Sequence, residues 1–98
     1  MYNRKAYIIC FDKGGVLDMF DYKGLKEVVK TAEGILNWWH YLESTYIIIT
    51  ESNISASDVA DFFRAHLINK HFLVSEVNLI NHNGWLPEKA WDWINKNK

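Results

Sequence analysis

The stretch Thr45-Tyr-Ile-Ile-Ile-Thr50 decides the fold class of this chain. It is short, and its four central residues are all apolar, which is typical of a strand. Because successive side chains of a strand point to opposite faces of the sheet, this run places apolar groups on both faces. Such a strand belongs in the interior of a sheet that is covered on both sides.

Two other runs share this pattern. Residues 6–11 (AYIICF) are almost wholly apolar and end at Asp12, Gly14 and Gly15, and residues 72–77 (FLVSEV) form a third strand. A fourth strand is expected at residues 38–41 (WWHY). It connects to the 45–50 strand through the bend at residues 42–44.

Helical periodicity separates these strands. Residues 22–34 carry apolar groups at helical spacing and end at Gly34, a plausible stop. Ser55 and Asp58 have the spacing of a capping box, so a second helix is expected from Ser55 onward. Pro87 suits the first position of a terminal helix that ends in a lysine-rich segment.

The expected order is therefore strand, helix, two strands, helix, strand and a terminal helix, in one domain covering residues 1–98. This order predicts an α+β fold, a ferredoxin-like βαββαβ sandwich with an additional C-terminal helix. Two helices cover one face of such a sheet. Since the strands are apolar on both sides, the second face needs the terminal helix, a second copy of the chain, or both, and we expect a homodimer.

Composition narrows the function classes. The chain has 11 basic and 12 acidic side chains and a net charge of −1, so it offers little overall attraction for nucleic acid, although a local basic patch remains open. The single cysteine, Cys10, excludes an intramolecular disulfide and lies in an apolar run, where we expect a buried, inert thiol. No signal peptide or membrane-spanning run is present, so we expect a cytoplasmic protein without a membrane partner.

Two Trp-rich segments carry a family resemblance. Asn37-Trp-Trp-His-Tyr-Leu-Glu-Ser-Thr-Tyr46 and Gly84-Trp-Leu-Pro-Glu-Lys-Ala-Trp-Asp-Trp-Ile-Asn95 are similar to paired motifs of the SinR-like family of small bacterial and phage proteins. A first strand ending in an aromatic residue and an aspartate, here Phe11-Asp12, also resembles that family. The resemblance implies a ferredoxin-like fold, related to CRISPR-associated integration and ribonuclease proteins and to VapD-like toxins. One departure is the loop Lys13-Gly-Gly-Val-Leu17, where relatives often have a polar loop with Asn or Pro.

Asp12 is the candidate catalytic and metal-binding residue. The resemblance implies that Asp12 lies near a dimer axis, where two copies would supply hard oxygen ligands for Mg²⁺ or Mn²⁺. The alternative interpretation is a turn in which Asp12 accepts hydrogen bonds from the amides of Gly14 and Gly15. The four histidines are too scattered to indicate a metal cluster.

Candidate binding residues lie around the predicted 38–41 strand. Trp39 and Tyr41 could stack nucleobases, with His40 as a stacking neighbour or general base. Strand alternation sends Trp38 and His40 to one face and Trp39 and Tyr41 to the other, so at least one pair belongs to the core. Lys13 and the two glycines after it have amides to offer a phosphate, without the spacing of a P-loop.

Residues 11–17 also resemble the first motif of haloacid-dehalogenase-type phosphatases, and residues 47–50 imitate their second motif. The general-acid aspartate of that family is replaced by Gly14, and the chain is too short for a five-stranded parallel core. Two hypotheses remain ahead of it. The first is a non-enzymatic, homodimeric module that binds nucleic acid, a nucleotide or another protein. The alternative is a metal-dependent nuclease that uses Asp12 from both subunits. A toxin or anti-defence component, suggested by the relatives alone, is a third.

Overall fold

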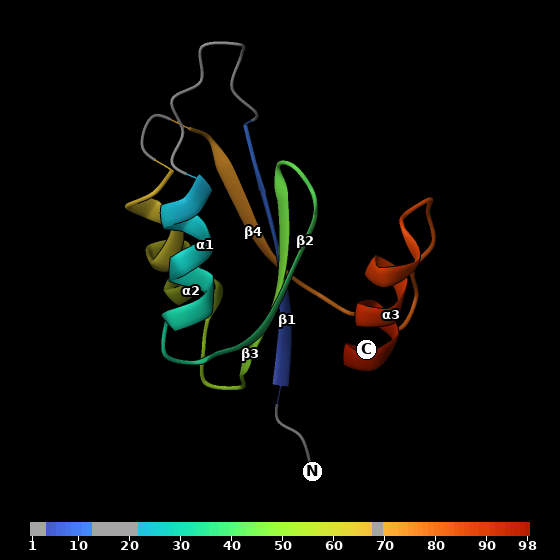
Figure 1. The fold of residues 1–98 in the computed structure, drawn as a ribbon. Coiled ribbons are helices and arrows are strands. Elements are labelled where there is room, and N and C mark those ends of the chain that lie inside the picture. Colours follow the sequence, from blue (N-terminus) through green and yellow to red (C-terminus); the bar gives the residue numbers. More distant parts are fainter. Residues whose placement is uncertain (1–3, 13–21, 68–69) are drawn as a thin grey trace.

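The fold is built from four strands and three helices in the described part of the chain. The computed structural model describes residues 4–12, 22–67 and 70–98 (Figure 1). The elements along the chain are β1 (Arg4–Phe11), α1 (Tyr22–Thr31), β2 (Ile35–Leu42), β3 (Thr45–Glu51), α2 (Ala56–Arg64), β4 (Phe72–Val77) and α3 (Glu88–Asn97). None of these helices is long and apolar enough to cross a membrane.

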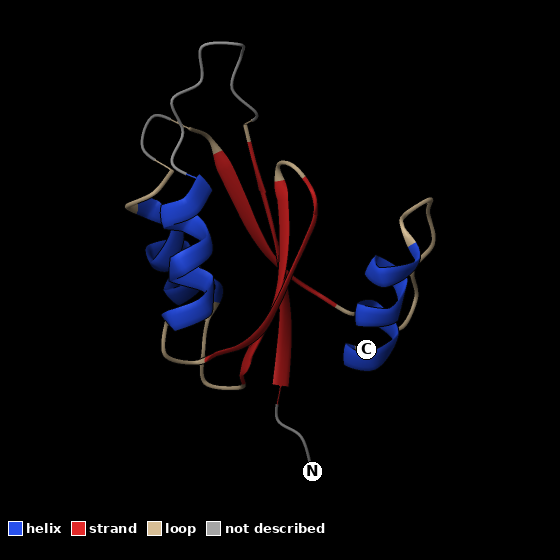
Figure 2. Cartoon of the chain, viewed as in Figure 1, coloured by secondary structure: helices blue, strands red, loops and turns tan. Residues whose placement is uncertain are grey.

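The four strands form a single sheet in the order β2-β3-β1-β4, and every neighbouring pair is antiparallel. β1 and β3 are the inner strands, and β2 and β4 are the edges. Figure 2 shows α1 and α2 on one face of the sheet and α3 on the other. The prediction of an α+β domain is confirmed, and below we call the α1 and α2 side the first face and the α3 side the second face.

The first face carries the larger core. One alternating set of sheet residues, which includes Tyr7, Ile9 and Ile48, packs against helix residues such as Val59 and Phe63. All five are at most 1% exposed. The hydroxyl of Tyr7 donates to the carbonyl oxygen of Ile54 at 2.7 Å, so its polar atom is satisfied within the packed layer.

The second face carries a smaller core beneath α3. Trp39, Ile47 and Ile49 of the sheet pack against Ala90 and Ile94 of the helix. The indole Nε1 of Trp39 donates to the carbonyl oxygen of Ala90 at 3.3 Å. The terminal helix is therefore one cover of the second face, as the sequence required.

Local signals set the ends of the helices. The capping box is confirmed: the Asp58 amide donates to Ser55 Oγ at 3.1 Å, and the Ser55 amide donates to Asp58 Oδ2 at 2.9 Å. The first helix ends at Thr31, earlier than predicted, and Gly34 adopts φ +92° as the chain turns into β2. This left-handed conformation favours glycine because it lacks a Cβ.

One prediction about the core is wrong, since Cys10 is exposed. Its place in the register explains this. Cys10 points to the second face, where its partners across the sheet are Thr45 and Leu73. The core beneath α3 includes Ala6 and Ile8 of β1, which precede Cys10 on the same face, but not Cys10 itself.

Candidate functional site

The topology places a polar pair at one end of the sheet. Asp12 directly follows β1, and His71 directly precedes β4, which is the antiparallel neighbour of β1. The His71 amide donates to Asp12 Oδ2 at 3.0 Å, and the Asp12 amide donates to the His71 carbonyl oxygen at 3.0 Å. His71 Nδ1 lies 3.2 Å from the same carboxylate oxygen, and Lys70 Nζ donates to the carbonyl oxygen of Asp12 at 3.2 Å.

These contacts keep the Asp12 carboxyl ionised. The hydrogen bond from the His71 amide lowers the pKa of Asp12 below its ordinary value of 3.8, and the His71 ring and the Lys70 charge act in the same direction. The Asp12 side chain is 59% exposed. An exposed, ionised carboxylate can face a cation, which is the chemistry expected for this position.

Among the described residues, the side chains around Asp12 do not form a complete metal site. In the described part of the chain, no three His, Cys, Asp or Glu side chains are grouped as metal ligands. Mg²⁺ is commonly held by one or two carboxylates together with waters and phosphate oxygens. Asp12 therefore fits as one ligand of such an ion, and no second carboxylate is grouped with it among the described residues.

A hollow of about 470 Å³ lies between α2 and β4, beside this pair. Small side chains on α2, Ala56, Ser57 and Ala60, form one wall. Its basic lining residues are Arg64, Lys70 and His71. The guanidinium carbon of Arg64 lies 5.6 Å from the centre of the Phe72 ring, which is within the range of a cation–π contact.

The second face has an end that α3 leaves uncovered. Its residues are Cys10, Tyr41, Thr45 and Leu73, which we call the open end. Leu73 is 64% exposed and Tyr41 is 42% exposed, although both belong to strands. A hollow of about 380 Å³, lined by Cys10 and Leu73 together with Asp12 and His71, connects the open end to the polar pair.

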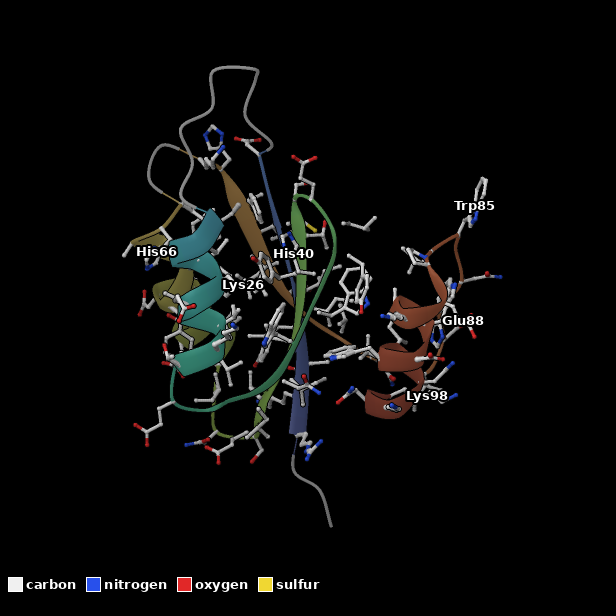
Figure 3. The ribbon with its side chains drawn as sticks, viewed as in Figure 1. Lys26, His40, His66, Trp85, Glu88 and Lys98 are labelled. Atoms are coloured by element: carbon white, nitrogen blue, oxygen red, sulfur yellow. The ribbon has the colours of Figure 1, made fainter. Side chains whose placement is uncertain are left out.

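Of the predicted binding residues that the structure describes, only Trp39 and Tyr41 are brought together. Trp39 is only 2% exposed and has no ring face to offer a base, so it does not fit the predicted stacking role. His40 lies on the first face, where its ring stacks on Tyr46 at 4.0 Å and its Nε2 lies 3.0 Å from the Glu43 carbonyl oxygen (Figure 3). Tyr41 is exposed on the second face, with its ring 5.4 Å from that of Trp39. Lys13 and the glycines after it lie outside the described residues.

The hollow between α2 and β4 is not evident from the sequence. Arg64 is the last residue of α2, and Lys70 and His71 precede β4, so the two parts of the basic group come from separate segments. The detectable signal was the run Lys70-His71-Phe72 before a predicted strand. Nothing in the spacing shows that Arg64 lies over Phe72, because this contact depends on how α2 packs beside the sheet edge.

The chain matches no family model, no curated protein and no solved structure in comparisons with known proteins.

Proposed function

We propose that this chain is a homodimeric binding module of the SinR-like type, with a ferredoxin-like βαββαβ sandwich, and that its ligand is a nucleic acid or a nucleotide. The fold part is supported by β1 lying between β3 and β4, as in a split βαβ arrangement. We place it in the cytoplasm as part of the same proposal, because its single cysteine allows no intramolecular disulfide.

The observation that carries the homodimer is the open end. The strand residues Leu73 and Tyr41 expose apolar surface beside a packed core, and such surface is typical of an interaction site. A two-fold axis would set the open ends of two copies against each other, because the same patch then serves both subunits. The exposed thiol of Cys10 would lie within this interface.

Size-exclusion chromatography with light scattering tests the proposal. Wild type should elute as a dimer, and Leu73→Lys should be a folded monomer because two lysines would be desolvated in the interface. Ile80→Lys is the matched control: Ile80 is 70% exposed but lies in the turn after β4, so the dimer should persist. A wild-type monomer at micromolar concentration contradicts the homodimer. Excess absorbance at 260 nm on the same peak would indicate a co-purified nucleotide or nucleic acid.

A metal-dependent nuclease is the second candidate, favoured by the exposed and ionised Asp12 beside His71. Asp12 lines the same hollow as two residues of the open end. A dimer formed through the open end would therefore place the Asp12 carboxylates of both copies near its axis. A bound Mg²⁺ or Mn²⁺ would neutralise phosphate charge and make water a better nucleophile. Within this chain, Asp12 would hold the cation, and the His71 amide would keep the carboxylate oriented and charged.

This candidate requires cleavage of RNA or DNA that depends on Mg²⁺ or Mn²⁺. Asp12→Asn should abolish the cleavage and leave the circular dichroism spectrum unchanged, since the asparagine side chain can still accept from the His71 amide. Glu43→Gln, which neutralises an exposed carboxylate in the turn between β2 and β3, is the control. Cleavage that survives Asp12→Asn rules out this mechanism.

A further inference from the structure

The hollow between α2 and β4 combines two kinds of recognition chemistry. One end has the cationic groups of Arg64 and Lys70 together with the His71 ring, and none of the described residues that line the hollow is acidic. The wall beside it contains the aromatic ring of Phe72, which is partly buried against the first-face core. A ligand that fills this hollow should therefore carry negative charge next to a planar group.

Arg64 is placed to contact a planar group. Its guanidinium lies over the Phe72 ring at 5.6 Å, and its side chain is 66% exposed. An arginine held over a ring by a cation–π contact can offer its outer side to a nucleobase, because guanidinium planes stack on bases as aromatic rings do. The Asp61 carboxylate lies 3.7 Å from Arg64 Nε and is 70% exposed, so water screens this ion pair and a phosphate can replace it.

His71 and Lys70 are placed to contact phosphate. The His71 side chain is fully exposed, and its Nδ1 lies 3.2 Å from Asp12 Oδ2. The Lys70 ammonium is held at the carbonyl oxygen of Asp12, which fixes it beside the hollow. Both groups lie at the start of β4, next to Phe72, so charge and ring are only one or two residues apart in the sequence.

We propose that this hollow binds a nucleotide unit of a single-stranded nucleic acid, with Lys70 and His71 at the phosphate and the base stacked on Arg64 over Phe72. The inference rests on the proposed function and names the ligand and its site. A base must be unpaired to stack in this way, which favours a single strand over a duplex. The exposure of Arg64 and His71 favours a strand over a free nucleotide, since sites for small molecules usually enclose most of the ligand.

Fluorescence anisotropy with a labelled RNA or DNA strand of about 10 nucleotides tests the site. The double variant Arg64→Ala with Lys70→Ala should lose roughly 10- to 100-fold in affinity. The slope of log K against log salt should become shallower by roughly 0.7 for each phosphate contact removed. Phe72→Leu keeps an apolar group against the core. It should weaken binding roughly 5- to 10-fold, because Arg64 loses the ring that holds its guanidinium in place.

The matched control is the double variant Lys5→Ala with Lys98→Ala. These lysines line a different hollow, of about 290 Å³, which also contains Glu76, and the change in net charge is the same. Their removal should change the affinity less than twofold. Equal losses in the two double variants would show that only net charge matters, and this would overturn the site.

Three further outcomes overturn the inference: tighter binding to a duplex of the same sequence, displacement of the strand by an equal concentration of mononucleotide, and no binding to the wild type. Light scattering on the same samples separates the two proposals. A dimer that binds strands equally well after Arg64→Ala with Lys70→Ala overturns the site but not the binding module. A monomer whose strand binding is lost in that variant supports the site and overturns the homodimer.

Discussion

The two faces of the sheet differ in how completely they are covered. On the first face, α1 and α2 close over a continuous layer in which Phe63 and Ile48 have no exposed surface. On the second face, α3 covers the region around Trp39 and Ile49, and the sheet beyond it stays open at Leu73. The comparison teaches that the first face maintains the fold, whereas the second is part structural and part available for contact.

The largest expected effect is on the first face. Phe63→Ala removes a ring with no exposed surface from between α2 and the sheet. The centroid of this ring lies 5.8 Å from that of the Tyr46 ring. We expect it to lower the free energy of unfolding by about 3–5 kcal/mol. Urea denaturation followed by far-ultraviolet circular dichroism measures this loss. A loss below that of the next variant would show that the first face is not the dominant core.

A smaller effect is expected beneath α3. Ile94→Ala removes a side chain that is 4% exposed from the smaller second-face core, and about 2–4 kcal/mol should be lost. Because α3 is attached through one face, its amides should exchange with solvent faster than those of β1 and β3. Hydrogen exchange followed by NMR checks this. Equal exchange rates for the amides of α3 and those of β1 and β3 would contradict the difference between the faces.

Gly34→Ala, between α1 and β2, should lower the free energy of unfolding by about 1–2 kcal/mol or more through the backbone. Gly34 has φ +92°, and an added Cβ would lie 2.7 Å from Cδ1 of Ile54, so both backbone and packing oppose a side chain. Gly34→Ala should lower the urea midpoint. Ile54→Ala removes both close atoms, Cδ1 at 2.7 Å and Cγ1 at 3.0 Å, so Gly34→Ala added to Ile54→Ala and compared with Ile54→Ala alone should leave only the backbone cost. Gly84→Ala, at φ +156° with the nearest atom of Trp91 3.8 Å from the added Cβ, is the control without a close contact and should cost less.

The smallest effect is expected at the polar pair. The pKa of Asp12 is lowered, so its charged form contributes stability above the ordinary value of 3.8, and this contribution is lost as pH falls through the lowered pKa. Asp12→Asn should therefore be less stable than wild type at neutral pH and equally stable in strong acid. Urea midpoints at both pH values measure the difference. A difference in urea midpoint that persists in acid would mean that Asp12 acts through something other than its charge.

Much of the fold was accessible from the sequence. The limits of β4 agree with the 72–77 strand, and the capping box marked the start of α2, because both signals depend on neighbouring residues. The burial of Cys10 was mispredicted because the sequence of a strand does not show how far along it a covering helix extends. β2 extends beyond its predicted residues 38–41 since cross-strand pairing with β3 recruits Ile35 and Leu42.

The candidate site was accessible only in part. Asp12 was singled out correctly as the polar residue at a strand end, but its partner His71 is 59 positions away and became visible only when β1 and β4 paired. Alternation separated Trp39 from His40 but could not tell which would be core, because both faces are packed in this part of the sheet. The pairing of Arg64 with Phe72 requires tertiary structure.

The position of β1 has a consequence for how the chain folds. β1 is made first, yet its two neighbours are β3 and β4, and the last pairing joins residues as far apart as Ala6 and Val77. During synthesis, an emerging chain holds an unsatisfied inner strand until β4 leaves the ribosome, and such edges invite association with other chains. Pairings between distant segments also slow folding. We expect the joining of β1 and β4 to limit the folding rate, with α3 docking onto a sheet that is already complete.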